Sequence, residues 1–195
     1  MPYHEFVGPP GSGKTTAALG LLTSDSTLTP GRRSIASKNT ATQLNRFGLP
    51  AEGLSMWLRL IVGLPRDLTM ATLFFRETDQ LQRSLIMLVL LIKSRALAGS
   101  PRQWVVDQGL QQQILSALAD QCLPEERALG WKRRCLGVPW KPEKLITIAV
   151  SSDELIRRVK NSSKHMQQCA GKSPEKYVGE NCLAFEILFN GIAKR

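Results

Sequence analysis

The sequence predicts an α/β protein in three α/β/α layers, with a mostly parallel sheet between helices and a helical insertion. Short apolar runs alternate with helical patterns along the 195 residues, and 43% of the residues are hydrophobic. The segments that join successive apolar runs are long enough to be the crossovers that parallel strands require. The length and the apolar fraction suit one domain over residues 1–195.

The first apolar run, at residues 3–7, predicts a buried strand because a loop rich in glycine and proline follows it directly. Apolar side chains recur over 15–22, which predicts a helix that begins at that loop. Residues 24–31 are polar and contain a Pro-Gly pair, as is typical of a turn. A weaker apolar signal at 33–37 indicates a second strand.

Residues 51–99 have a helical pattern, because apolar side chains recur there at three- and four-residue spacing. We expect Pro65 to break the first helix, and we expect two more helical segments over 68–75 and 81–97. The most apolar stretch of the chain, 85–92, is too short to cross a bilayer and predicts a buried helix.

The second half of the sequence contains two further strand signals. Residues 104–107 form a short apolar run that ends in a carboxylate, and 145–150 is the clearest strand signal of the chain. Between them, the helical spacing over 110–118 and the charged segment 124–136 predict two helices.

The last 45 residues are expected to be helical at both ends. Ser151 and Glu154 have the spacing of a capping box, so a helix is expected to run from there to about Lys160. Residues 161–176 are polar and basic and contain glycine and proline, which predicts a mobile loop. A last amphipathic helix is expected over 183–192.

The net charge is +10 and the isoelectric point is about 9.9, so the surface attracts polyanions such as nucleotides, nucleic acid or an anionic membrane face. The alternative is a basic soluble protein whose charge serves no particular partner. The sequence shows neither a Lys/Arg-rich tail nor an aromatic-basic repeat, which makes a dedicated nucleic-acid module the weaker interpretation.

The cysteines indicate no zinc site, because none of them forms a C-x-x-C pair and the chain has only two histidines. We expect reduced, structural thiols in a cytoplasmic protein. The N-terminus lacks the pattern of a signal peptide, which agrees with that location. The four cysteines are Cys122, Cys135, Cys169 and Cys182.

The motif that indicates a function lies between the first strand and the first helix. It matches G-x-x-x-x-G-K-[ST], the P-loop, at every fixed position. The alternative of a chance match in a glycine-rich loop is disfavoured, because the motif has a strand before it and a helix after it. Its residues are Gly8, Pro9, Pro10, Gly11, Ser12, Gly13, Lys14 and Thr15.

Each residue type in this motif has a physical reason to be there. Glycines let the backbone wrap closely around an anion and direct several N–H groups at it, and the helix that follows adds its positive end. Lys14 supplies a compact charge for the β- and γ-phosphates, and Thr15 offers a hydroxyl to Mg²⁺. We therefore expect ATP and Mg²⁺ as cofactors. Thr16 offers a second hydroxyl, either to a phosphate or merely to solvent.

Asp107 is the second candidate site residue. Ligands of parallel sheets bind beyond the carboxyl ends of the strands, where an acidic side chain can face the water shell of Mg²⁺. The apolar run before Asp107 places it at such an end. The alternative is that Asp107 caps the helix that starts near Gly109.

A basic group follows the clearest strand and forms the third feature. In this lid-like segment, 157–176, a cation could close over the triphosphate and stabilise charge on the transferred group. The alternative is a solvated basic face. Arg157 and Arg158 point in different directions on a helix, so we expect one of them to reach inward; Lys160 and Lys164 complete the group.

The order of these features resembles the nucleoside and nucleotide kinases among the P-loop NTPases, especially the thymidylate-kinase-like group. The resemblance covers most of the chain in layout and is specific at the P-loop. It implies phosphate and metal roles for Lys14 and Thr15, the acidic position of an Asp-Arg motif for Asp107, and a loose match of Arg157 or Arg158 to lid arginines. Gln108 stands where that family has an arginine.

Two functions follow as expectations. The first is an ATP-Mg-dependent phosphotransferase that acts on a small-molecule acceptor, with the helical block 51–99 as a wall of the acceptor pocket. The alternative is an ATP-binding regulator or weak ATPase that works through a protein or nucleic-acid partner. The sequence names neither the acceptor nor the oligomeric state.

Overall fold

The computed structural model describes residues 3–24, 28–30, 54–99, 103–169 and 171–190. Over these residues the chain is mostly helical, with a small parallel sheet, and so has the α/β character that the sequence predicts. The strand expected at 33–37 lies outside the described residues.

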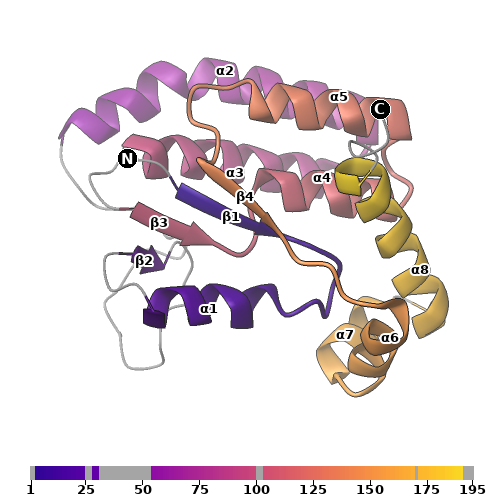
Figure 1. Ribbon diagram of the computed structural model, residues 1–195. Helices are drawn as coiled ribbons and strands as arrows, with labels where there is room; N and C mark the ends of the chain where they lie inside the picture. Colours follow the sequence, from indigo (N-terminus) through magenta and orange to yellow (C-terminus); the bar gives the residue numbers. More distant parts are fainter. Residues whose placement is uncertain (1–2, 25–27, 31–53, 100–102, 170, 191–195) are drawn as a thin grey trace.

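The sheet contains β1 (Tyr3–Val7), β2 (Leu28–Pro30), β3 (Gln103–Val106) and β4 (Lys144–Thr147) in the order β2-β3-β1-β4. All three pairings are parallel. Parallel strands bring their carboxyl ends to one edge of the sheet, and the glycine-rich loop begins at that edge, directly after β1 (Figure 1).

The central strands are the most buried, as expected for a sheet that is covered on both faces. Every residue of β1 is buried, whereas β4 is a partly exposed edge strand. The ladder of β4 ends at Thr147, so this strand is shorter than the predicted 145–150, although the Ile148 amide still donates to Val7 O at 2.8 Å. The prediction of a turn over 24–31 is wrong for its last part, because residues 28–30 form β2 and pair with β3.

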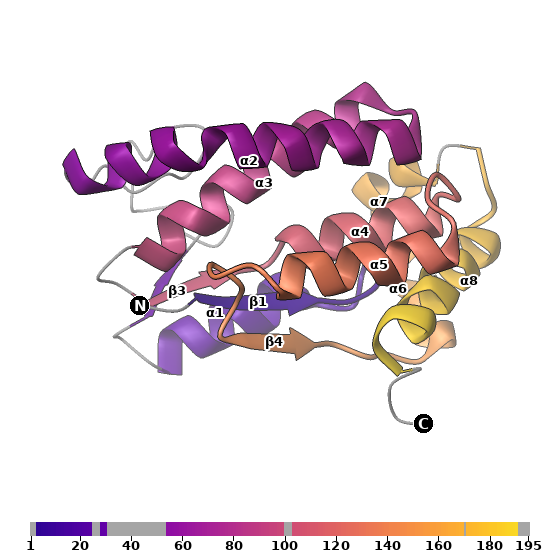
Figure 2. The same cartoon turned by 90° about the horizontal axis from the view of Figure 1, so that it is seen from above.

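Helices lie on both faces of the sheet. Figures 1 and 2 show α1 (Lys14–Ser24) on one face, and α4 (Leu110–Ala119) and α5 (Glu125–Leu136) on the other. The predicted helices 15–22, 110–118 and 124–136 correspond to these three within two residues at each end. The largest cluster of buried apolar side chains joins α4 and α5 to β1 and includes Val7, Leu110, Ile114, Leu115 and Trp131.

The helices α2 (Leu54–Thr78) and α3 (Leu81–Gly99) form an antiparallel pair. The expected break at Pro65 is wrong, because α2 continues through it. Pro65 is exposed, so water can hydrate the carbonyl that loses its N–H partner, and packing against α3 offsets the remaining cost.

The apolar stretch 85–92 lies within α3 and is buried on only one side, which corrects the prediction of a buried helix. Met87 and Leu91 are fully buried in the main cluster. The opposite side of α3 exposes Leu85, Ile86 and Val89. Among the described residues, no helix has the length and hydropathy needed to span a membrane.

The prediction of a mobile loop over 161–176 is wrong. This segment contains α7 (Ser163–Gln168) and the start of α8 (Pro174–Phe185). Both helices have serine N-caps: Ser162 accepts from the His165 amide, and Ser173 accepts from the Lys176 amide. The predicted helix over 183–192 likewise begins too late, since α8 already covers its first residues and a π-helix, η1 (Glu186–Asn190), follows.

The expected helix after the last strand is present as α6 (Ser152–Lys160), with Ser151 as its N-cap. The predicted capping box is wrong, because Ser151 makes no side-chain cap hydrogen bond. The Glu154 carboxylate is bonded to two arginines on the same helix and does not reach back to Ser151.

The four cysteines are free thiols. Within the described part of the chain, no group of three or more His, Cys, Asp or Glu side chains could hold a metal ion.

Glu5 is a fully buried carboxyl in the middle of β1, and its burial gives a testable pH dependence. Burial raises the pKa of Glu5 from 4.5 to about 7, although amide hydrogen bonds from α4 oppose the shift. The native state therefore binds the proton more tightly than the unfolded chain does. This stabilisation is fully present below pH 4.5 and is lost as the pH rises through 7.

We expect the free energy of unfolding to fall by about 3 kcal/mol between pH 4.5 and pH 8 through this one group. Chemical denaturation at a series of pH values measures this change. Glu5→Gln is the comparison, because the glutamine side chain does not titrate. The difference between the two proteins should shrink toward low pH; a constant difference would contradict the buried, titrating carboxyl.

Candidate functional site

The loop between β1 and α1 has the backbone conformation that its glycines permit. Gly11 and Gly13 have φ angles of 79° and 89°, in the left-handed region that disfavours side chains. A turn that contains Gly11 is closed by the Ser12 amide, which donates to Pro9 O at 3.1 Å. Positive φ angles at alternate residues are a backbone pattern in which successive amides can turn toward one side, as they do in anion-binding nests.

Gly8 is required for a different reason, which is space. A Cβ added at Gly8 would lie 2.6 Å from Ile148 O, which follows β4. The glycine thus lets the last residues of two neighbouring strands pass closely at the point where the loop begins.

Lys14 folds back over the loop instead of extending into solvent. Its Nζ donates to Gly8 O at 2.7 Å and to Pro9 O at 2.9 Å. Burial lowers the pKa of Lys14 to about 8, and the nearby Asp107 carboxylate opposes that shift. The ammonium is therefore still mostly charged at pH 7. Two neutral carbonyls replace part of its hydration, and the oxygens of an anion could displace them.

Thr15 and Asp107 meet across the edge of the sheet. Thr15 Oγ1 donates to Asp107 Oδ2 at 2.8 Å, although the two residues are 92 positions apart. Asp107 is buried directly after β3, and Thr15 is in the first turn of α1. A hydroxyl and a carboxylate at this separation are a donor set for a hard cation such as Mg²⁺, which commonly takes one or two protein oxygens and completes its shell with water and phosphate.

Asp107 is not the N-cap of α4, which was the alternative role for this residue. Gly109 is the N-cap residue of α4 and has no side chain. The buried Glu5 carboxylate replaces the missing cap, since its Oε1 accepts from the amides of Gln111 at 2.8 Å and Gln112 at 3.3 Å. Asp107 is thereby left facing Thr15 and the loop.

The two arginines of α6 differ in their relation to the loop. Arg158 donates from Nη1 to Gly11 O at 3.1 Å. Arg157 makes two 2.8 Å hydrogen bonds to Glu154, and its side chain is 67% exposed. Glu154 also accepts from Arg158 Nε at 2.7 Å, and the two guanidinium groups hold the pKa of Glu154 at about 2. Arg158 is thus the arginine that reaches inward, as expected of one of the pair.

An open pocket of about 620 Å³ lies beside the loop. One wall comes from the loop and α1, and the other comes from α6, α7 and the residue after β4. Thr16, whose role the sequence leaves open, faces this space. The lining residues are Gly11, Ser12, Gly13, Thr16, Ala17, Ile148, Arg158, Ser162 and His165.

The structure brings together the sequence-predicted residues of the loop, Asp107 and Arg158, but not Arg157. Of the other basic residues in the lid-like segment, Lys160 pairs with Glu175 at 2.6 Å. Sequence reasoning missed Gln112, which bonds the loop, and His165, which lines the pocket. The histidine lies in a segment predicted to be a loop. The glutamine is one of three in succession, and no periodicity distinguishes a buried glutamine from a solvated one.

The difference between the two arginines can be tested directly. Arg158→Ala should weaken the binding of a triphosphate about tenfold, the effect of losing one charge-assisted hydrogen bond of about 1.5 kcal/mol. Arg157→Ala, which removes the same charge from the next position, is the matched control and should change the Kd by less than about twofold. Equal losses in the two variants would mean that the arginines act only through net charge.

No family model matches the chain, and neither the curated proteins nor the solved structures contain a significant match to it.

Proposed function

We propose that this chain is an ATP-Mg-dependent phosphotransferase that acts on a small-molecule acceptor. One observation carries the proposal: a loop with two left-handed glycines brings Lys14 together with Thr15 and Asp107 at the start of a helix. A cation, a hydroxyl-carboxylate pair and directed amides are what a polyphosphate and its metal ion require.

Each residue has a defined part in this proposal. The amides of the loop bind the β-phosphate, and Lys14 exchanges its two carbonyl partners for phosphate oxygens. Thr15 and Asp107 would hold Mg²⁺, which would neutralise charge on the triphosphate. Arg158 approaches from the α6 side and stabilises charge on the transferred group. Catalysis is then positioning and charge neutralisation, with little covalent chemistry by the protein.

The fold is part of the same proposal. The parallel strands, with α1 on one face and α4 and α5 on the other, support the three-layer P-loop fold. The thymidylate-kinase-like branch is proposed from the sequence resemblance alone. We assign the nucleoside part of ATP to the pocket of about 620 Å³ beside the loop, where Ala17 and Ile148 offer apolar contact and His165 offers a polar group. We assign the acceptor to the side of α2 and α3, the described part of the helical block.

The reaction in this proposal transfers the γ-phosphoryl group from ATP to an acceptor hydroxyl or phosphate oxygen. The bond from the γ-phosphorus to the bridging oxygen of ADP breaks, and a bond to the acceptor oxygen forms. An acceptor hydroxyl releases its proton to solvent water in the same step. The products are ADP and the phosphorylated acceptor.

A panel of nucleosides, nucleotides and small metabolites, each incubated with the protein and ATP-Mg²⁺, tests this activity. We expect one chemical class of acceptor to give ADP and a phosphorylated product in equal amounts, detected by mass spectrometry. Lys14→Ala is the control for contaminating kinases. If no acceptor yields a product while ATP binding is intact, the phosphotransferase proposal is wrong.

The alternative is an ATP-binding regulator or weak ATPase that acts through a protein or nucleic-acid partner. The net charge of +10 and the exposed Gln108 beside Asp107, in place of an arginine, favour it. Slow ATP hydrolysis without an acceptor, accelerated by single-stranded RNA or DNA, would support this alternative. Acceptor-dependent release of ADP by the purified chain would argue against it.

A further inference from the structure

Three consecutive glutamines at the start of α4 are buried, with Gln111 1% exposed and Gln112 and Gln113 8% exposed. Burying an amide is unfavourable unless its polar atoms are bonded. For Gln112 and Gln113 the partners differ. Gln112 bonds the main chain at the start of the glycine-rich loop, whereas Gln113 donates from Nε2 to Arg83 O on α3.

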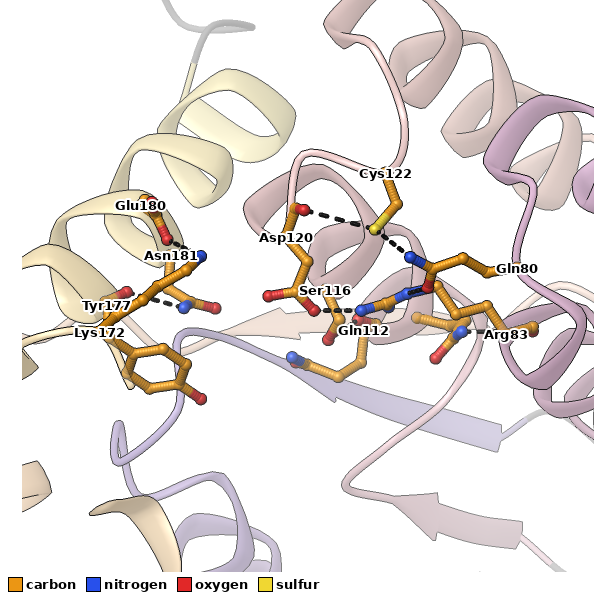
Figure 3. A network of polar contacts seen from close by, with 11 residues as sticks. Gln80, Arg83, Gln112, Ser116, Asp120, Cys122, Lys172, Tyr177, Glu180 and Asn181 are labelled. Carbon is orange, nitrogen blue, oxygen red and sulfur yellow. Dashed lines mark hydrogen bonds and ion pairs between the residues drawn. The ribbon is translucent and has the colours of Figure 1, made fainter. Parts of the chain in front are cut away.

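Gly8 needs a partner that the sheet does not supply. The last residue pair between β1 and β3 is Glu5 with Val106, because the chain turns away after β3. The Gly8 amide lies three residues beyond that pair and is buried. Gln112 Oε1 accepts from it at 3.2 Å, so a side chain of α4 continues the hydrogen bonding where the strand has ended. Figure 3 shows Gln112 and Ser116 on α4, with β1 behind them.

Gln112 is itself fixed from the opposite direction. Its main-chain amide and that of Gln111 donate to Glu5, which caps α4 from within β1. The approach is so close that a Cβ added at Gly109 would lie 2.4 Å from Glu5 Cδ. Ser116 Oγ also donates to Gln112 O at 3.0 Å. Thus a side chain of β1 holds the main chain of α4, and a side chain of α4 holds the main chain after β1.

We propose that Gln112 is a positioning residue, which orients the phosphate-binding loop through the Gly8 amide. This inference rests on the proposed function, because it assigns Gln112 a part in the same ATP site. The carbonyls of Gly8 and Pro9, which lie in the next two peptide units, hold Lys14. Fixing the Gly8 amide therefore anchors the start of the segment on which the ammonium group rests. A loop that is preset in this way binds the triphosphate without first having to order its backbone.

The experiment compares Gln112→Met with Gln113→Met in the full chain. Both substitutions replace a buried amide by a thioether of similar length in the same helix, but only the first removes the partner of Gly8. The readouts are hydrogen exchange of the Gly8 amide by NMR, and the Kd for ATP-Mg²⁺ by calorimetry. Gln112→Glu keeps an acceptor oxygen and tests rescue of the exchange readout.

We expect Gln112→Met to accelerate exchange at Gly8 at least tenfold and to weaken ATP-Mg²⁺ binding about tenfold. Gln113→Met should leave both values within about twofold, and Gln112→Glu should keep Gly8 protected. If Gln112→Met does not fold, Gln112→Asn, which is one methylene too short to reach Gly8, provides the same test.

Unchanged exchange at Gly8 in Gln112→Met would overturn the proposal, as would equal losses of affinity in the two methionine variants. The outcome is separable from that of the proposed function. If the wild-type chain does not bind ATP-Mg²⁺, the ATP site itself is wrong, whereas the exchange of Gly8 still shows whether Gln112 holds the loop.

Discussion

Replacement of Lys14 by alanine is expected to weaken ATP-Mg²⁺ binding at least 100-fold and to abolish turnover, with little change in the melting temperature. The ammonium lies over the loop on two carbonyls, where a triphosphate would place its β- and γ-oxygens. A 100-fold loss corresponds to about 2.7 kcal/mol, the size expected for a partly desolvated charge contact. Calorimetry for binding and a thermal melt for stability measure the two quantities separately.

The matched control is Lys144→Ala. Lys144 is the exposed first residue of β4 and lies at the end of the strands opposite the loop. The Lys144→Ala variant should bind ATP-Mg²⁺ with the affinity of the wild-type chain. A similar loss in both variants would show that the basic surface as a whole, and not Lys14, attracts the nucleotide.

Asp107→Asn should remove the dependence of ATP binding on Mg²⁺ and lower turnover about 100-fold. Asparagine keeps the size of the side chain and still offers an oxygen, but it lacks the charge that would hold the cation. Titration of Mg²⁺ at fixed ATP, followed by calorimetry, measures the effect.

Thr15→Val provides a double-mutant cycle with Asp107→Asn, since the two side chains are 2.8 Å apart. If they hold one cation together, the double variant should lose little more than the worse single variant. Strictly additive losses would mean that the hydroxyl and the carboxylate serve different steps. Asp120→Asn is the control, because this carboxylate pairs with Arg83 at the far end of α4.

The elements around the loop could be predicted from sequence because their signals are local. The apolar run of β1, the glycine-rich loop and the first turn of α1 are contiguous, and the carboxylate of Asp107 follows a strand directly. Pro65 shows where this reasoning fails. A proline is expected to break an isolated helix, but α2 is packed along α3, and tertiary packing outweighs the local preference.

The prediction for the C-terminal segment failed for a related reason. Residues 161–176 are polar, basic and interrupted by glycine, a composition that is typical of a loop. The same residues contain two local helix-start signals, Ser162 and the Ser173-Pro174 pair. These helices bury their apolar side in a cluster with α6, to which Leu155 of α6, Cys169 at the end of α7 and Tyr177 of α8 contribute. Such a cluster exists only in three dimensions, so no window of sequence contains it.

The candidate site shows the same division. Lys14 and Thr15 belong to a motif with fixed spacing, and Asp107 directly follows a strand, whereas the contact from Gln112 to Gly8 joins residues 104 positions apart. Glu5 is likewise a charged residue in a strand that reads as apolar, and its burial is intelligible only with the amides of α4 beside it.

Calorimetric titration of the purified chain with ATP, in the presence and absence of Mg²⁺, is the most direct test of the central claim that the loop from Gly8 to Thr15 binds a nucleoside triphosphate. We predict saturable binding of one ATP per chain, strengthened by Mg²⁺ and lost in Lys14→Ala. If neither adenine nor guanine triphosphates produce a binding isotherm with Mg²⁺ present, the phosphate-binding role of this loop is contradicted.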